Sequence, residues 1–401
     1  MSNQCKVTVI DSICGSGKTS KAIEYMNNNT DKKFIYITPY LDEIQRVLKE
    51  CDCRVFFEPK TEKGEGSKLK DFNRLLSLGK NIVSTHALFA MVNDDTLNYL
   101  KENNYTLILD EVFNVVEEIK ITKSDREILL RDKVIVADDG KITWIDKSYK
   151  GTLSKYKNAI EQGDCYLFDD CFMLWTFPVC VMDALDHTYI LTYMFKGQIQ
   201  RYYYDMNNIN YEYKAVKKIN DKYEVVDYNE NEDLTYLKEL IHIYDNKKLN
   251  KIGDDKYALS KSWYEKQDKN KTDGFDLLKN NIFNYFQNIV KGKSKENMWT
   301  CFKDFKTKCK GKGYTKGFVS CNARATNDYR HKKNLAYVVN IFNNPMILKF
   351  FRNKGVSVDE NSFALSELIQ WIFRSQLRDG KEINLYIPSS RMRNLLKQWL
   401  D

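Results

Sequence analysis

The residues with the clearest chemical potential lie in the segment SICGSGKTS, which begins at Ser12. Gly15, Gly17, Lys18 and Thr19 follow the phosphate-binding P-loop (Walker A) pattern, except that Ser12 stands where a first glycine is usual. Glycines let successive backbone N–H groups point at a phosphate, and the following helix N-terminus adds partial positive charge. The pattern predicts that Lys18 reaches the β- and γ-phosphates of a nucleotide and that the Thr19 hydroxyl binds Mg²⁺. The alternative is a glycine-rich turn with a chance lysine.

A pair of acids forms the second chemical signal. Asp110 and Glu111 end the apolar run YTLILDE, 92 residues beyond Lys18. An acidic pair at this place relative to a P-loop is typical of ATPases (Walker B). Asp110 would hold Mg²⁺ through its water shell, and Glu111 would polarise the attacking water. The alternative is that both acids cap the start of a helix.

Alternating strands and helices must position these residues. We expect strands at residues 7–10, 33–38, 81–84, 105–110 and 187–195. Helical spacing follows the P-loop, and TPYLDEIQRVL reads as a turn into a helix. This alternation predicts a parallel sheet with covering helices, whose ligands sit at the carboxyl ends of the strands. Lys18, Thr85 and Asp110 all follow strand ends, so we expect them to converge.

The composition excludes several classes of protein. The chain has 401 residues, 43% of them hydrophobic and 29% charged, which indicates two or three ordinary folded domains. The first residues do not resemble a secretory signal peptide, and no apolar run is long enough to span a membrane. The ten cysteines show no zinc-binding spacing, so we expect reduced thiols in a cytoplasmic protein without a membrane partner.

The positive charge gathers in one segment. The whole chain carries a formal net charge of +8, while residues 241–320 hold 18 Lys and Arg against nine Asp and Glu. Ten aromatic residues are interleaved there, between Trp263 and Tyr314. Basic residues mixed with aromatics suit a phosphate backbone and stacked bases. A solvated face whose aromatic side chains turn to the core would produce the same pattern, and the sequence leaves both readings open.

The second half of the chain repeats an α/β pattern after a division that we place near residue 200. Residues 120–165 read as a polar insertion with short strands. Beyond residue 200, we expect strands at 201–216, 222–228, 316–320 and 383–389. We expect helices at 234–246, 274–290, 334–342, 363–380 and 391–400.

Taken in order, these motifs resemble those of superfamily 2 helicases of the DExH/DEAD type, including those carried by bacteriophages. CGSGKTS matches motif I, LILDEVF matches motif II, and ILTYMF looks like motif III with Tyr193 in place of alanine. NARATND resembles motif V and QWIFRSQLR resembles motif VI. The resemblance covers most of residues 1–200 and about 316–390, and Phe113 departs from the usual motif II. It implies two RecA-like domains in tandem, at 1–200 and 201–401, with a basic insertion at about 241–315.

The resemblance also implies roles. ATP with Mg²⁺ would bind at the P-loop; the expected nucleotide-binding set is Ser12, Gly15, Ser16, Gly17, Lys18, Thr19, Ser20 and Gln370. Single-stranded DNA or RNA would be contacted by Thr38, Gln45, Thr85, Thr326 and Asn327. Thr192 would couple hydrolysis to the binding of nucleic acid. For Thr38 and Thr85, an equally good interpretation is that each caps the helix that follows it.

Two arginines are candidates for an arginine finger. The four-residue spacing of Gln370, Arg374 and Arg378 predicts that all three share one helical face. Either arginine would stabilise charge on the γ-phosphate. The alternative is a pair of surface arginines.

The implied activity is that of a nucleic-acid-dependent ATPase, a helicase or translocase. The sequence does not identify which replication or recombination proteins, if any, are partners. Two other functions share a P-loop: a terminase-like packaging ATPase and a small-molecule kinase.

Overall fold

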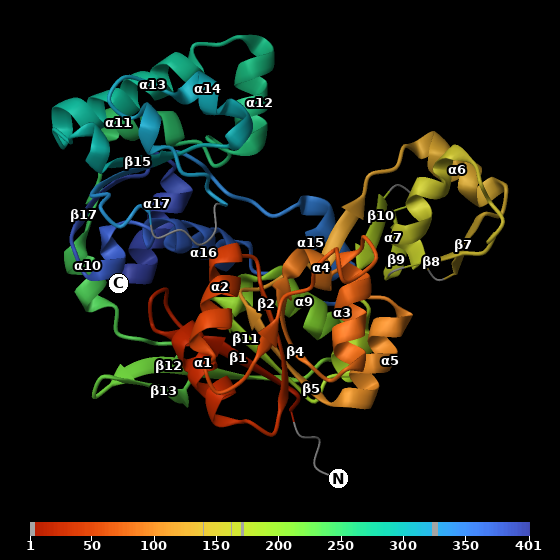
Figure 1. The fold of residues 1–401 in the computed structure, drawn as a ribbon. Coiled ribbons are helices and arrows are strands. Elements are labelled where there is room, and N and C mark those ends of the chain that lie inside the picture. Colours follow the sequence, from red (N-terminus) through yellow and green to blue (C-terminus); the bar gives the residue numbers. More distant parts are fainter. Residues whose placement is uncertain (1–4, 139, 162, 170–171, 323–327) are drawn as a thin grey trace. The chain divides into compact units, whose positions relative to one another are not determined.

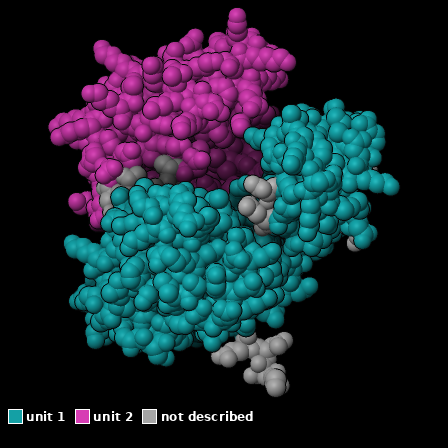
Figure 2. All heavy atoms as spheres, turned by 45° about the vertical axis from the view of Figure 1, so that its right-hand side comes forward, with its two compact units in different colours: residues 1–12, 16–228, 345–358 teal, residues 13–15, 229–344, 359–401 magenta. Residues whose placement is uncertain are grey.

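The computed structural model describes residues 5–138, 140–161, 163–169, 172–322 and 328–401. The chain divides into two compact units, which Figure 2 colours separately. The first consists of Met1–Ser12, Ser16–Tyr228 and Pro345–Val358, and the second of Ile13–Gly15, Asn229–Asn344 and Asp359–Asp401. We expected a division near residue 200, whereas the first unit continues to Tyr228, because strand β12 pairs with β1.

The first unit is built on an eight-stranded sheet with the order β13-β12-β1-β11-β5-β2-β4-β3 (Figure 1). Its neighbouring strands are parallel except for the antiparallel pair β12 and β13. The strands are β1 (Val7–Asp11), β2 (Lys33–Thr38), β3 (Phe56–Phe57), β4 (Asn81–Thr85), β5 (Tyr105–Asp110), β11 (His187–Thr192), β12 (Tyr211–Ile219) and β13 (Lys222–Asp227).

Helices cover both faces of this sheet, because its central strands are apolar on both sides. Phe34 and Ile108 pack with buried residues of α1 (Lys18–Asn28) and α2 (Leu41–Glu50). Ile35 packs on the other face with the helices that follow. These are α3 (Lys68–Ser77), α4 (His86–Phe89), α5 (Asp94–Asn103) and α9 (Ile199–Met206). The period-2 alternation of buried side chains therefore sets two cores, one on each face.

An insertion follows β5 and forms a separate five-stranded antiparallel sheet with the order β6-β10-β9-β8-β7. Its strands are β6 (Val116–Ile119), β7 (Ile135–Asp138), β8 (Lys141–Trp144), β9 (Asp164–Phe168) and β10 (Phe172–Thr176). The helices of this region are α6 (Lys123–Arg131), α7 (Lys157–Glu161) and α8 (Val179–Asp183). The short strands expected between residues 120 and 165 are confirmed, and the sheet extends beyond them. Helix α15 (Pro345–Asn353) returns to this unit, where the Phe350 ring lies 5.5 Å from that of Tyr166.

The second unit has a four-stranded parallel sheet with the order β14-β17-β16-β15. The strands are β14 (Ile241–Tyr244), β15 (Asn297–Thr300), β16 (Asn334–Tyr337) and β17 (Ile383–Tyr386). The α-helices are α10 (Thr235–Leu240), α11 (Lys247–Asn250), α12 (Lys261–Asn270), α13 (Gly274–Asn284), α14 (Lys306–Cys309), α16 (Glu360–Ile372) and α17 (Ser390–Leu400). The expected helices at 274–290 and 391–400 and the strand at 383–389 are confirmed in substance.

Four expected elements are wrong. The segment 334–342 begins with strand β16 instead of a helix, and residues 241–244 are strand β14. Residues 201–206 belong to helix α9, and Thr315–Gly317 is a 3₁₀ turn, with Phe318 joined to Trp299 by an isolated bridge. A strand buried on both faces has a continuous apolar pattern, which periodicity cannot distinguish from a buried helix.

Candidate functional site

The loop between β1 and α1 has the backbone that its glycines predict. Gly15 has φ of 87° and Gly17 has φ of 92°, values that glycine adopts without steric cost. The Lys18 Nζ donates to the backbone oxygen of Ser12 at 2.5 Å, so the ammonium group folds back over the loop. A Cβ on Gly17 would collide with the ring of Tyr223 from β13. Both the backbone and the lack of space therefore require glycine at position 17.

Ser12 has a structural role that explains its departure from the P-loop pattern. Its Oγ accepts a hydrogen bond from the backbone N–H of Val216 at 2.7 Å. This bond fixes the first strand of the β12–β13 hairpin beside the end of β1. The Ser20 hydroxyl also has a partner, because it accepts from Arg46 at 2.8 Å. The Ser16 hydroxyl, by contrast, is buried and has no hydrogen-bond partner among the described residues.

Asp110 lies at the centre of the site, at the carboxyl end of β5. Its side chain is buried, with 6% exposure. Thr19 Oγ1 donates to Asp110 Oδ1 at 3.4 Å, and Thr38 Oγ1 donates to Oδ2 at 3.2 Å. Burial, followed by the neighbouring charges of Glu111 and Glu43, raises the pKa of Asp110 to about 7, against the opposing effect of the hydrogen bond from Thr38. Thr19 and Asp110, 91 residues apart, are thus brought together as the sequence predicted.

Glu111 follows Asp110 in an unusual conformation. Its φ is 70°, which a residue with a side chain rarely adopts, and its backbone N–H donates to the Leu191 oxygen at 2.9 Å. Its Oε2 is buried without a hydrogen-bond partner among the described residues. A strained backbone together with an unsatisfied carboxylate oxygen is a combination found at functional sites.

The oxygen atoms of Thr19 and Asp110 are the donors from which a metal site could be made. Mg²⁺ prefers oxygen ligands, and proteins usually bind it through one or two carboxylates together with substrate phosphates. In the part of the chain that the structure describes, no group of three or more His, Cys, Asp or Glu residues could hold a metal by itself. The donor set therefore fits a cation shared with a phosphate-bearing ligand.

Other predicted residues surround this centre in different ways. Thr38 is fully buried and its hydroxyl faces Asp110, while Thr85 caps α4 by accepting from the Leu88 N–H at 3.3 Å. The Thr192 hydroxyl is buried and has no partner among the described residues. Gln45 lies on α2 and lines a pocket described below.

Two features were missed by reasoning from the sequence. Both carboxylate oxygens of Asp11 accept backbone N–H groups, from Met194 and Phe195, each at 2.8 Å, and burial raises the pKa of Asp11. An acid at the end of a strand, directly before the loop, was the available signal. The contacts of Arg46 with Ser20 and of Tyr223 with Gly17 join residues far apart in sequence, so no local signal could have found them.

The second unit holds the arginines. Helix α16 ends at Ile372, so the expected helical face shared by Gln370, Arg374 and Arg378 is wrong. Arg374 lies in the turn that follows and is 8% exposed, and Arg378 lies in a 3₁₀ helix, Gln376–Asp379. The Ser375 hydroxyl donates to the Ile372 oxygen at 2.6 Å and accepts from the Leu377 N–H at 3.3 Å, which turns the chain away from the α-helix. Thr326 and Asn327 lie outside the described residues.

Of the ten aromatic residues from Trp263 to Tyr314, most serve the core. Six of the ten are buried: Tyr264, Tyr285, Phe286, Trp299, Phe305 and Tyr314. Phe283 is 38% exposed. Phe113, which departs from the usual motif II, is likewise a core residue, with its ring 4.9 Å from that of Phe177.

Comparisons with known proteins agree with this architecture. A solved structure of S. tokodaii Xpd4 matches with a TM-score of 0.51 at 12% identity, over 98% of this chain and 94% of the other. A structure titled XPD_Helicase matches with a TM-score of 0.42 at 12% identity, over 98% and 95%. At such identity the likeness to Xpd4 shows the fold alone. The predicted α/β class with parallel sheets is confirmed.

A family model and a curated relative match this chain more directly. The model described as the YonV C-terminal Rossmann-like domain matches residues 235–400. The SPbeta prophage-derived uncharacterized protein YonV of Bacillus subtilis (strain 168) is 46% identical over 410 residues, which cover 99% of each chain. Within the described residues, no helix has the length and apolar character to cross a membrane. Identity at this level over nearly the full length shows that this chain belongs to the family of the prophage-derived protein YonV.

Proposed function

We propose that this chain is a nucleoside triphosphatase whose hydrolysis of ATP depends on a nucleic acid, as in helicases and translocases. One observation carries the ATPase part: Lys18, Thr19 and Asp110 meet at the carboxyl ends of β1 and β5, although 91 residues separate Thr19 from Asp110. Such an edge of a parallel sheet is the usual ligand site of this kind of fold. The nucleic-acid part rests on the resemblance to helicase motifs.

Each residue has a defined task in this proposal. Lys18 and the N–H groups of the glycine loop bind the phosphates. Thr19 and Asp110 would hold Mg²⁺, which would supply positive charge to the phosphate oxygens. Glu111 accepts a hydrogen bond from the attacking water through its unsatisfied oxygen. Water adds to the γ-phosphorus, the bond to the β–γ bridging oxygen breaks, and ADP and phosphate leave. We assign the arginine finger to Arg374 or Arg378 from the motif resemblance alone.

The proposal is tested by steady-state ATP hydrolysis with and without single-stranded DNA or RNA. We expect a stimulation of roughly tenfold or more, which corresponds to about 1.4 kcal/mol in the barrier. Lys18→Ala should abolish this stimulation. The matched control is Lys101→Ala, which removes an exposed lysine of α5. Hydrolysis that no polynucleotide changes would contradict the nucleic-acid part. Phosphate transfer to a small acceptor would instead favour a kinase.

A further inference from the structure

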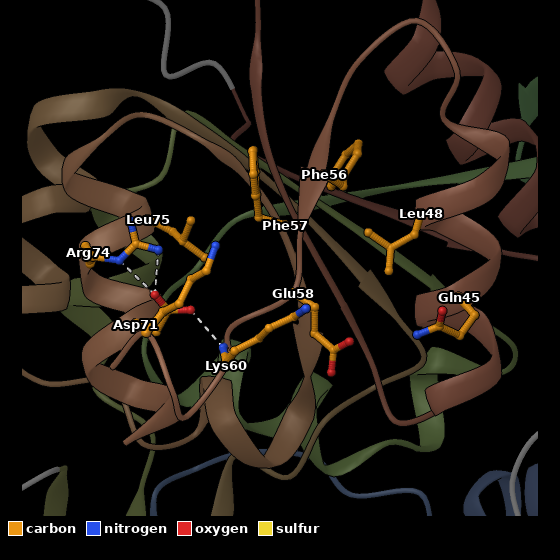
Figure 3. A pocket seen from close by; sticks show the side chains of 10 residues that line it. Gln45, Leu48, Phe56, Phe57, Glu58, Lys60, Asp71, Arg74 and Leu75 are labelled. Carbon is orange, nitrogen blue, oxygen red and sulfur yellow. Dashed lines mark hydrogen bonds and ion pairs between the residues drawn. The ribbon is translucent and has the colours of Figure 1, made fainter. Parts of the chain in front are cut away.

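A second site lies at the edge of the first sheet, at the end of β3. A pocket of about 300 Å³ lies there. It is bordered by Gln45 and Leu48 of α2, Phe57 of β3, and Arg74 and Leu75 of α3 (Figure 3). This volume is at the lower end of the range found for ligand pockets. β3 is parallel to β4 and forms the flank of the sheet, where Phe57 is level with Ile82 of β4 and therefore with Leu107 of β5, three residues before Asp110. Two strands, β2 and β4, lie between β5 and β3.

The charges around the pocket favour an anionic occupant. Asp71 is 1% exposed, pairs with Arg74 at 2.7 Å and accepts the backbone N–H of Lys60 at 2.8 Å, so its charge is satisfied within the protein. Glu58 pairs with Lys68 at 3.7 Å. The side chains of Lys60 and Lys63 are exposed and form no ion pair with the described residues. The rim therefore presents two exposed lysines that form no ion pair with the described residues, with the exposed Glu62 between them in the sequence.

The apolar surface of the pocket suits a planar ring. Phe57 and Leu48 are each 36% exposed, whereas Phe56 and Leu75 beside them are buried. An exposed phenyl ring on a firmly packed floor offers a stacking surface, and the Gln45 amide can donate to and accept from the edge of a base. Aromatic stacking and nearby cations are the means by which proteins bind single-stranded nucleic acids.

Helix α2 connects this pocket to the nucleotide site. Ile44 and Val47 are buried against the sheet, which fixes the helix in place. Gln45 and Leu48 line the pocket, and the intervening Arg46 donates to Ser20 of α1 at 2.8 Å. A packed helix that contacts both places can transmit a shift from one to the other.

We propose that the pocket at the end of β3 binds one nucleotide of a single-stranded nucleic acid, with its base on Phe57 and its phosphates beside Lys60 and Lys63. Helix α2 reports this occupancy to Ser20 at the start of α1. The inference rests on the proposed function and deepens it, because it identifies where the nucleic acid is held on the first unit.

The experiment measures the anisotropy of fluorescein-labelled oligo-dT and oligo-rU with the full chain, without ATP. We expect Phe57→Ala to weaken binding by roughly 5- to 100-fold, from the measured value of stacking, and Phe57→Tyr to retain it. Lys60→Ala with Lys63→Ala should lower the slope of log K against log salt by about 0.7 for each lysine. The matched control for Phe57→Ala is Leu78→Ala, at an exposed apolar residue directly after α3. The matched control for the lysine variants is Lys101→Ala.

Different failures have different meanings. If Phe57→Ala binds like Leu78→Ala and the salt slope is unchanged, the pocket is not the nucleotide site, while the proposed ATPase stands. If the unmodified protein binds neither oligonucleotide at low salt, the nucleic-acid part of the proposed function fails as well. Thermal melting of each variant shows whether a loss of binding reflects unfolding, and the Phe57→Tyr variant keeps the test decisive in that case.

Discussion

The end of β5 and the end of β3 belong to the same sheet but have opposite character. At β5, Asp110 is 6% exposed, and hydroxyl groups of Thr19 and Thr38 surround it. At β3, Phe57 is 36% exposed beside lysines without ion pairs among the described residues. The first environment makes charge costly and favours a neutralising cation; the second is solvated and attracts anions. One sheet therefore carries a buried carboxylate on a central strand and an exposed aromatic ring on its flanking strand.

Phe113→Ala should produce the largest loss of stability, because Phe113, just after β5, is buried, whereas Phe57 of β3 is partly exposed. Phe113 is 3% exposed and its ring packs against Phe89 and Phe177. We expect a loss of about 3–5 kcal/mol in the free energy of unfolding, measured by urea denaturation. Phe57→Ala should cost about 1 kcal/mol or less. Equal losses would show that the β3 end is as tightly packed as the β5 end.

Lys18→Ala separates the two ends by function. If Lys18 binds the reacting phosphate as we propose, loss of this cation should lower kcat by roughly 10²- to 10³-fold. Binding of oligo-dT in the absence of ATP should stay unchanged, since the β3 pocket does not include the loop. A parallel loss of oligonucleotide binding would show that the two ends form one site.

Ser12→Ala tests the buried hydrogen bond that joins the end of β1 to β12. The backbone N–H of Val216 would lose its acceptor in a buried position. We expect a loss of about 1–3 kcal/mol in the free energy of unfolding. Ser77→Ala, at the exposed end of α3, should change it by about 0.5 kcal/mol or less. An unchanged urea midpoint for Ser12→Ala would mean that water replaces the hydroxyl.

Asp110→Asn tests how much the negative charge of the buried Asp110 carboxylate lowers the free energy of unfolding. The pKa of Asp110 is raised from 3.8 to about 7, so between these values the folded state binds more protons than the unfolded state. Stability of the nucleotide-free protein should therefore fall as pH rises from about 4 to 7, by at most about 1.4 kcal/mol for each pH unit from this group. Asp110→Asn should flatten this part of the profile. Identical melting profiles for the two proteins would exclude a buried charge at Asp110.

Local patterns were sufficient wherever short stretches of sequence carry the physics. The P-loop strand, turn and helix, and the apolar strand that ends in Asp110, are dictated by glycine conformations and by alternating burial. Residues 334–337 show the limit: NLAY could be either a buried helix or a buried strand, and only its pairing with β15 and β17 decided for the strand. Ser375 likewise ended the α16 region through its own hydrogen bonds, which the spacing of the arginines did not reveal.

The sequence by itself determined the α/β class and which residue types stand at the β5 end, because each signal lay in one segment. Only the tertiary structure decided that Ser12 serves β12, that Arg46 reaches Ser20, and that Phe57 lines a pocket together with α2. Ser12 and Val216 are 204 positions apart in the sequence, and Ser20 and Arg46 are 26 positions apart. Such contacts depend on which strands become neighbours in the sheet, a choice made by the packing of the whole chain.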